Sequence, residues 1–370
     1  MTDFVTEARK ETLDKDLDKF VHVEEAASFV ARGLVAPGLG LLFLALSAVI
    51  ASFFVMGEPG SIVIIAAAAI GGYMALNIGA NDVANNVGPA VGARALTMGG
   101  ALAIAAVFES AGALIAGTDV VTTISSGIVS PDAIADTRIF VRLMLAALIS
   151  AALWINLATW IGAPVSTTHS VVGGVVGAGI MAAGVTVINW SMLGGIASSW
   201  VISPLLGGVV ASLFLAFIKA RIIYQDDKIG AARLWVPLLI AVMAGAFAAY
   251  LATKGLKRVI DLSALQITVA GAGCFVLVWG LAKISVDRQA AGMENRNQSL
   301  RELFRLPLIF SAALLSFAHG ANDVSNAVGP LAAIVQAVSG NPSATVTIPL
   351  WVMVIGAIGI SVGLVCSGRN

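Results

Sequence analysis

Ten apolar runs of about twenty residues dominate this chain of 370 residues. A helix needs about 20 mostly apolar residues to cross the hydrocarbon core of a bilayer. Many of the runs are rich in glycine and alanine, which let membrane helices pack closely. We therefore predict an all-α polytopic membrane protein with about ten transmembrane helices. The runs cover residues 33–55, 61–80, 97–117, 139–162, 170–188, 191–218, 234–253, 264–283, 304–325 and 346–367.

The composition excludes most soluble functions. Only 11% of the residues are charged and the mean hydropathy is +0.95, whereas soluble domains carry about 25% charged residues. The formal net charge is zero, so no overall positive field would attract a nucleic acid. HExxH, GxSxG and P-loop motifs are all missing from the sequence, so we expect neither an enzyme nor a bound cofactor.

The basic residues predict which side of the membrane each loop faces. If the N-terminus is cytoplasmic and every run crosses once, sixteen Lys and Arg residues lie inside and five outside. Cytoplasmic loops carry an excess of Lys and Arg, so this orientation is favoured. We expect the protein to lie in the cytoplasmic (inner) membrane of the cell. Residues 1–32 form a charged cytoplasmic leader, either an amphipathic surface helix or a solvated tail. The five residues expected outside are Arg138, Arg142, Lys254, Lys257 and Arg258.

One motif occurs twice. Residues 79–89 read GANDVANNVGP and residues 320–330 read GANDVSNAVGP, which match at nine of eleven positions with an offset of 241. The spans that carry the two copies are seven steps apart, an odd number, so the copies should point in opposite directions. Such inverted-topology repeats are typical of secondary transporters, whose sites lie near the midplane at broken helices.

The repeat suggests a division of the chain. We predict a leader at 1–32, an extra N-terminal span at 33–59, a first repeat half at 60–218, connecting spans and cytoplasmic loops at 219–303, and a second repeat half at 304–370.

The repeated motif supplies oxygen ligands at membrane depth. Asn81 and Asp82 in the first copy and Asn322 and Asp323 in the second offer amide and carboxylate oxygens, which suit a hard cation such as Na⁺. Glycine and proline flank these residues and can free backbone carbonyls by breaking the helix. The simpler alternative is that the polar residues cap a helix end. Two matching copies favour function, and we assign Na⁺ sites to Asp82 and Asp323.

A second polar segment, APVSTTHS at residues 163–170, precedes a glycine-rich apolar run. Helix N-termini present free N–H groups and partial positive charge, and the hydroxyls of Ser166, Thr167 and Thr168 add neutral donors for an oxyanion. Helix capping by Ser and Thr is the simpler explanation of the same residues.

Three further ionisable side chains lie in or near apolar runs. Glu109 could bind the cation or carry a proton, or it could hydrogen-bond a neighbouring helix. His169 and His319 are candidates for proton carriage or for supporting the site, and simple packing is an equal alternative for His169.

The two GAND motifs and the PVSTTH segment resemble those of the inorganic phosphate transporter family, the PiT permeases. The resemblance runs from about Gly60 to the C-terminus. It implies two inverted halves, each with a broken helix and a re-entrant hairpin, and phosphate entry coupled to Na⁺ or H⁺. It also implies cation binding at the Asn–Asp pairs and phosphate contact by the Ser/Thr segment, to which we add Asn85 and Asn326.

The chain departs from the family pattern at both ends. The span 33–55 comes before what would be the family's first helix. A second PVSTTH-like segment at the same offset would lie near 405–410, beyond Asn370, so we expect the second repeat half to lack its hairpin.

We predict a symporter that imports inorganic phosphate with Na⁺ or H⁺ by alternating access. The alternatives are a sulfate or other oxyanion permease of the same fold, and a non-transporting membrane sensor or partner subunit. The expected partners are phosphate, the coupling cation and the lipid bilayer, with a homodimer as the candidate assembly and no nucleic acid.

Overall fold

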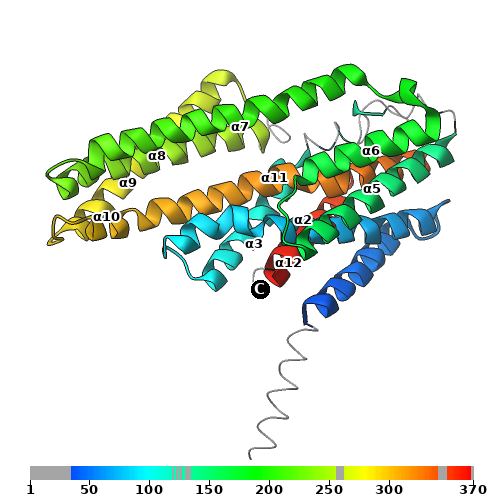
Figure 1. Ribbon diagram of the computed structural model, residues 1–370, viewed down its shortest axis with the longest axis horizontal. Helices are drawn as coiled ribbons and strands as arrows, with labels where there is room; N and C mark the ends of the chain where they lie inside the picture. Colours follow the sequence, from blue (N-terminus) through cyan, green and yellow to red (C-terminus); the bar gives the residue numbers. More distant parts are fainter. Residues whose placement is uncertain are drawn as a thin grey trace, which may run out of the picture.

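Nearly all of the described chain is helical. The computed structural model describes residues 35–118, 121, 124, 127–129, 134, 136–255, 262–340 and 348–367, so the predicted leader lies outside the described residues. The long helix α11 runs through the middle of the molecule, with α7, α8 and α9 along one side of it (Figure 1). The helices are the first helix Val35–Val55, α2 Ser61–Gly92, α3 Met98–Ala116, α5 Thr137–Trp160, α6 Thr167–Ala183, α7 Trp190–Ile218, α8 Lys228–Lys254, α9 Ala264–Ala290, α10 Asn297–Leu303, α11 Arg305–Val338 and α12 Leu350–Ser367.

Each of the ten apolar runs coincides with a helix. Among the described residues, seven helices are long and apolar enough to cross a membrane alone, and α10 with α11 makes an eighth if they form one bent span. The apolar helices α6 and α12 are shorter than a usual span. The all-helical fold class is confirmed, whereas the number of crossings stays a prediction.

The helices α2 and α11, which carry the two GAND motifs, run in opposite directions along each other. Gly60 before α2 faces Val338 at the end of α11, and Gly71 faces Leu331 further along. Asp82 then lies beside His319, nearer the start of α11. This antiparallel packing is the arrangement that an inverted repeat requires.

We expected both helices to break within the motif, but each continues through it. The helix α2 extends to Gly92 with Pro89 inside it, and α11 extends to Val338 with Pro330 inside it. A proline removes one backbone hydrogen bond and leaves the others intact, and the motif's polar groups find partners through their side chains. The bend that we expected lies instead between α10 and α11, which meet at 44°.

The helices α5 and α6 form a hairpin. Gly162 turns the chain with a φ of 68°, and Ser166 caps α6 by accepting a hydrogen bond from the backbone N–H of His169 at 3.3 Å. Beyond α6, Ile188 pairs with Val129 in an isolated bridge. The end of α6 therefore returns to the loop that precedes α5, as expected if the hairpin crosses and re-crosses the membrane.

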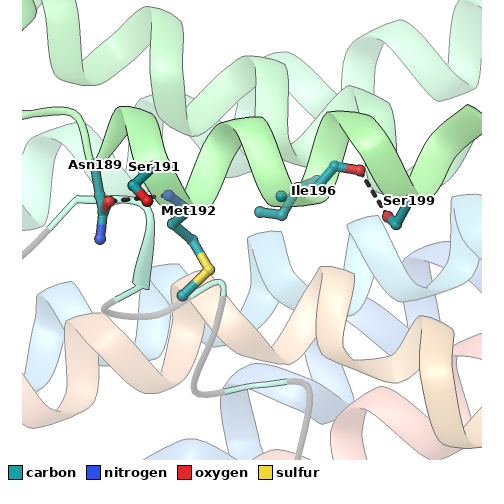
Figure 2. A pocket seen from close by; sticks show the side chains of 6 residues that line it. Asn189, Ser191, Met192, Ile196 and Ser199 are labelled. Atoms are coloured by element: carbon teal, nitrogen blue, oxygen red, sulfur yellow. Dashed lines mark hydrogen bonds between the residues drawn. The ribbon is translucent and has the colours of Figure 1, made fainter.

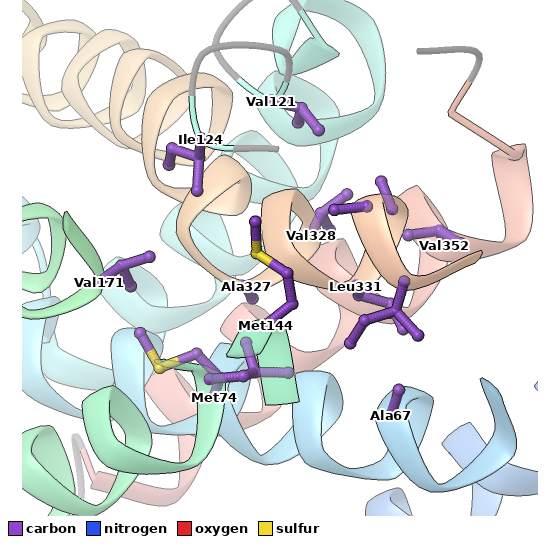
Figure 3. Packing of buried hydrophobic residues seen from close by; sticks show 14 of the residues in the cluster. Ala67, Met74, Val121, Ile124, Met144, Val171, Ala327, Val328, Leu331 and Val352 are labelled. Atoms are coloured by element: carbon purple, nitrogen blue, oxygen red, sulfur yellow. The ribbon is translucent and has the colours of Figure 1, made fainter. Parts of the chain in front are cut away.

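The main core fills the space between α2, α5, α6, α11 and α12 (Figure 3). Met74 of α2, Met144 of α5 and Leu331 of α11 are fully buried in it. The helix α7, by contrast, contains no buried residue along its whole described length. Leu193, Ile196 and Trp200 are partly buried against the core, and most of its other apolar side chains are exposed and free to face lipid.

Glycines allow two close helix crossings around the motif. A Cβ on Gly79 of α2 would meet the carbonyl oxygen of Ile360 of α12, and a Cβ on Gly320 of α11 would meet that of Glu109 of α3. Gly79 and Gly320 begin the two motif copies. The two motif helices thus make matching backbone contacts, α2 with α12 and α11 with α3.

Candidate functional site

Three carboxylates from different helices surround one histidine. His319 of α11 places Nε2 3.4 Å from Oδ2 of Asp82 and 3.5 Å from Oδ2 of Asp323. Its Nδ1 lies 3.1 Å from Oε1 of Glu109 of α3. The antiparallel packing of α2 and α11 brings the two motif aspartates together, and the α3–α11 crossing adds the glutamate.

These carboxylates are shielded from solvent. Glu109 is 1% exposed, and Asp82 and Asp323 are each 8% exposed. Bringing several negative charges into a low-dielectric site is costly unless positive charge compensates them. In the described part of the chain, the ion pairs of these three carboxylates all involve His319.

The donor set could hold a cation. Ligand atoms of Asp82, His319 and Asp323 all lie within 4.8 Å of one another. Among the described residues, Nε2 of His319 and Oε2 of Glu109 are buried without a hydrogen-bond partner. Asn86 donates to Oε1 of Glu109 and so orients that carboxylate. The cluster therefore combines hard oxygen ligands with one nitrogen that changes its charge on protonation.

The start of α6 reaches the same cluster. Thr167 donates a hydrogen bond of 2.6 Å from Oγ1 to Oδ2 of Asp323. The side-chain amide of Asn326 lies 3.3 Å from Oγ1 of Thr167 and 3.1 Å from Oγ1 of Thr168. The structure thus joins two segments that the sequence places far apart, the second GAND motif and the PVSTTH segment.

Ser166 and His169 lie at the edge of this arrangement. Ser166 is exposed, and its hydroxyl caps α6, which is the simpler role considered for it. His169 is exposed and its ring contacts Trp200 of α7, with ring centroids 3.8 Å apart. His169 therefore packs against a neighbouring helix and does not join the carboxylates.

The remaining motif asparagines have other partners. Asn85 donates to Oδ1 of Asp82 at 3.0 Å, and Asn322 lies 3.3 Å from Oδ1 of Asp323. Asn81 instead donates to Oγ1 of Thr159 of α5 at 3.0 Å. Asn85 is exposed and does not contact the Ser/Thr segment, unlike its repeat counterpart Asn326.

Sequence reasoning missed a polar ladder between α2 and α5. Asn156 of α5 donates to Oδ1 of Asn77 of α2 at 2.9 Å, one turn away from the Asn81–Thr159 contact. Asn77 in turn donates to the backbone carbonyl of Tyr73. A signal existed, because Asn156 and Thr159 are polar residues three apart in an apolar run.

A second unforeseen contact joins α3 and α12. The hydroxyls of Ser110 and Ser361 lie 2.7 Å apart, at an offset of 251 in sequence. Each serine is followed two residues later by a glycine, Gly112 and Gly363, that contacts the backbone of a motif helix. The two helices that cross the motif helices, α3 and α12, are therefore joined to each other at this serine pair.

A surface pocket of 510 Å³ lies at the start of α7, away from this cluster. It is lined by residues of α7 and its cap, among them Asn189, Met192 and Ser199 (Figure 2). Asn189 accepts from the backbone N–H of Met192, and Ser199 donates to the carbonyl of Ile196. Because these polar groups are satisfied within their own helix, we assign no ligand to the pocket.

Comparison with known proteins identifies the family. Residues 78–370, which include both GAND motifs and the PVSTTH segment, match the model of the phosphate transporter family. The chain belongs to this family. It is therefore an integral membrane protein.

Relatives and a solved structure agree with this assignment. A protein of Helicobacter pylori strain J99 that carries the name phosphate permease is 52% identical over 347 residues, covering 92% of this chain and 65% of the relative. A Pyrococcus abyssi protein named in the same way is 36% identical, covering 80% of this chain and 72% of the relative. A solved structure named "The sodium-dependent phosphate transporter" is 33% identical, with a TM-score of 0.78, covering 83% of this chain and 76% of that one.

The chain spans about two thirds of the length of the Helicobacter relatives, 65% in each case.

Proposed function

We propose that this protein imports inorganic phosphate across the cytoplasmic membrane by symport with Na⁺. Membership of the phosphate transporter family supports this proposal, as does the sodium dependence in the name of the similar solved transporter. The observation that carries it is the hydrogen bond between Thr167 and Asp323, because it joins the candidate anion site to the candidate cation site.

The contact offers a physical basis for coupling. Thr167 and Thr168 lie in the first turn of α6, where backbone N–H groups and the helix dipole favour an anion. Two like charges about 4 Å apart repel by about 4 kcal/mol at an effective dielectric constant of 20. A phosphate near an ionised Asp323 would meet such repulsion, and a cation at Asp82 and Asp323 would offset it. Each ion would therefore favour binding of the other.

The proposed roles follow from these positions. Asp82 and Asp323 hold Na⁺, with Asn81, Asn322 and Glu109 as further cation-site residues. Thr167, Thr168 and Asn326 contact phosphate, and Ser166 and Asn85 are proposed as further phosphate-site residues. His319 lies between the carboxylates and, when protonated, would compensate part of their negative charge. Alternating access would then proceed by movement of one repeat unit against the other around this site.

Uptake of radiolabelled phosphate into proteoliposomes tests the proposal. We expect uptake to require an inward Na⁺ gradient and to stop when choline replaces Na⁺. Asp82→Asn and Asp323→Asn should each lower Na⁺-dependent uptake at least tenfold. Asp136→Asn provides a matched control, since Asp136 caps α5 outside the cluster and Asn is an equally good cap.

Three results would contradict parts of the proposal. Uptake that follows a pH gradient and ignores Na⁺ would replace Na⁺ by a proton, for which His319 and Glu109 would be the candidates. Competition by sulfate as strong as by phosphate would change the anion. An absence of uptake by a correctly folded and inserted protein would favour a non-transporting role.

A further inference from the structure

A lysine side chain contacts the backbone of an arginine where α8 begins and α9 ends. Lys283 of α9 donates from Nζ to the backbone carbonyl of Arg233 of α8 at 3.1 Å, and to Oδ1 of Asp287 at 3.0 Å. Both helices are apolar enough to span a membrane. Arg233 lies about one turn inside the start of α8, at the depth where a span enters the polar part of the bilayer.

The guanidinium of Arg233 has a donor that the protein does not satisfy. Its Nε is buried and, within the described residues, has no hydrogen-bond acceptor. Arginine has five N–H donors in a planar fork that suits carboxylate and phosphate oxygens. Lysine and arginine near helix ends commonly extend their charge to the water, and Arg233 as a whole is half-buried, but its buried Nε has no acceptor there. The site therefore has a positive group in need of an anionic acceptor.

The surroundings indicate what kind of anion fits. Leu234, next to Arg233, and Leu281 and Ile284, close to Lys283, are strongly exposed apolar residues. Arg221 and Arg288 are exposed near the same ends of the helices and add positive charge. The carboxylate of Asp287 balances only one of the two charges of Arg233 and Lys283, so the group retains positive charge. Basic pockets between membrane helices, with apolar surface below them, bind the headgroups of anionic lipids.

We propose that Arg233 and Lys283 bind the phosphate group of an anionic phospholipid, whose acyl chains lie against the exposed apolar faces of α8 and α9. The site shares no residue with the carboxylate cluster around His319. Free inorganic phosphate offers the same oxygen chemistry, but it would leave the adjoining apolar residues without a partner. For this reason we assign the site to lipid and treat free phosphate as an outcome of the test.

Native mass spectrometry of the purified full chain measures this binding directly. The chain is stripped of lipid in a neutral detergent and then supplied with phosphatidylglycerol or phosphatidylcholine. We expect the chain to bind phosphatidylglycerol in preference to phosphatidylcholine. In Arg233→Gln the ratio of the two bound lipids should fall about fivefold, because one basic residue adds about that much attraction at an anionic surface. Arg301→Gln, which removes an exposed charge from α10, should keep the preference.

Two further measurements separate the effect of the charge of Arg233 from that of its planar shape, and lipid from free phosphate as the ligand. Arg233→Lys should retain part of the preference, because the charge remains while the planar fork is lost. Inorganic phosphate in millimolar excess should not displace phosphatidylglycerol. Equal loss in Arg233→Gln and Arg301→Gln, or displacement by inorganic phosphate, would overturn the lipid assignment. Size-exclusion profiles and helical circular dichroism establish that each variant is folded.

Discussion

At the scale of single residues, the decisive contacts are hydrogen bonds that link polar groups on different helices. Thr167 supplies the hydroxyl that reaches Asp323, and no other described residue of α6 contacts that carboxylate by a hydrogen bond. Hydrogen bonds to charged groups contribute about 1.5–3 kcal/mol. A single hydroxyl can therefore govern how well the two proposed ion sites work together.

Thr167→Val should weaken the apparent affinity for both phosphate and Na⁺ by about tenfold, because the variant keeps the side-chain shape and removes the donor to Asp323. Uptake kinetics at varied phosphate and varied Na⁺ measure this effect. Thr167→Ser, which restores a hydroxyl, should recover most of the affinity. Thr268→Val is the control, since the hydroxyl of Thr268 donates to the carbonyl of Ala264 within its own helix α9. Unchanged affinities in Thr167→Val would refute the proposed link.

The ladder of Asn77 and Asn156 predicts an effect on stability. Asn156→Leu should lower the free energy of unfolding by about 1 kcal/mol, the order found for interhelical hydrogen bonds in membranes, because Oδ1 of Asn77 loses its donor. Thermal unfolding of the purified protein in one detergent measures the change. Ser150→Ala serves as the control on the same helix, since Ser150 donates to the carbonyl of Ala147 within α5. Equal melting temperatures for the two variants would contradict a stabilising ladder.

At the scale of helices, glycine positions decide how closely the elements approach. Gly79 lies where the backbones of α2 and α12 touch, and Gly320 lies where the backbones of α11 and α3 touch. Small residues permit such crossings in membranes, where helices gain little from the hydrophobic effect against one another. The carboxylate cluster depends on these crossings, because Glu109 lies at the α3 contact of Gly320.

Gly79→Ala and Gly320→Ala should each destabilise the fold by about 1–3 kcal/mol, because the added methyl would overlap a backbone carbonyl that cannot move alone. Gly88→Ala in the same motif helix and Gly173→Ala in α6 have open space around the new methyl. These two should be neutral or slightly stabilising, since alanine favours helix over glycine. Melting temperatures of the four variants test the contrast, and a similar drop in all four would contradict it.

The helices themselves could be predicted from the sequence, and part of the site as well. Apolar length located ten of the eleven described helices, all except the short polar α10, and the repeated motif located Asp82 and Asp323. The correspondence between α3 and α12 could not be seen in the sequence. Their matching serines, Ser110 and Ser361, are 251 residues apart rather than the 241 that separate the two motif copies, and the two helices share few other residues. The central place of His319 was also hidden, since its contacts with Asp82 and Glu109 depend on how three helices cross.

At the scale of the whole molecule, contacts between distant segments agree with the predicted order of crossings, and the charge distribution predicts which side is cytoplasmic. Gly60 lies against Val338, and Ile188 pairs with Val129. If every predicted span crosses the membrane once, the two members of each pair lie on the same side, as these contacts require. The expected cytoplasmic side carries sixteen of the basic residues and the expected outer side five. The short helix α6 is the critical element, because every later loop changes sides if α6 does not cross.

Two introduced cysteines test this topology. In a background with Cys274→Ser and Cys366→Ser, a membrane-impermeant maleimide should label Thr137→Cys in intact cells, because we predict that the start of α5 faces outside. Gln225→Cys, in the exposed loop between α7 and α8, should be labelled only after the membrane is permeabilised. Lys219, Arg221 and Lys228 surround that position and favour the cytoplasmic side. Labelling of both cysteines in intact cells would show that the chain crosses once fewer between them, and α6 would then be a re-entrant hairpin arm.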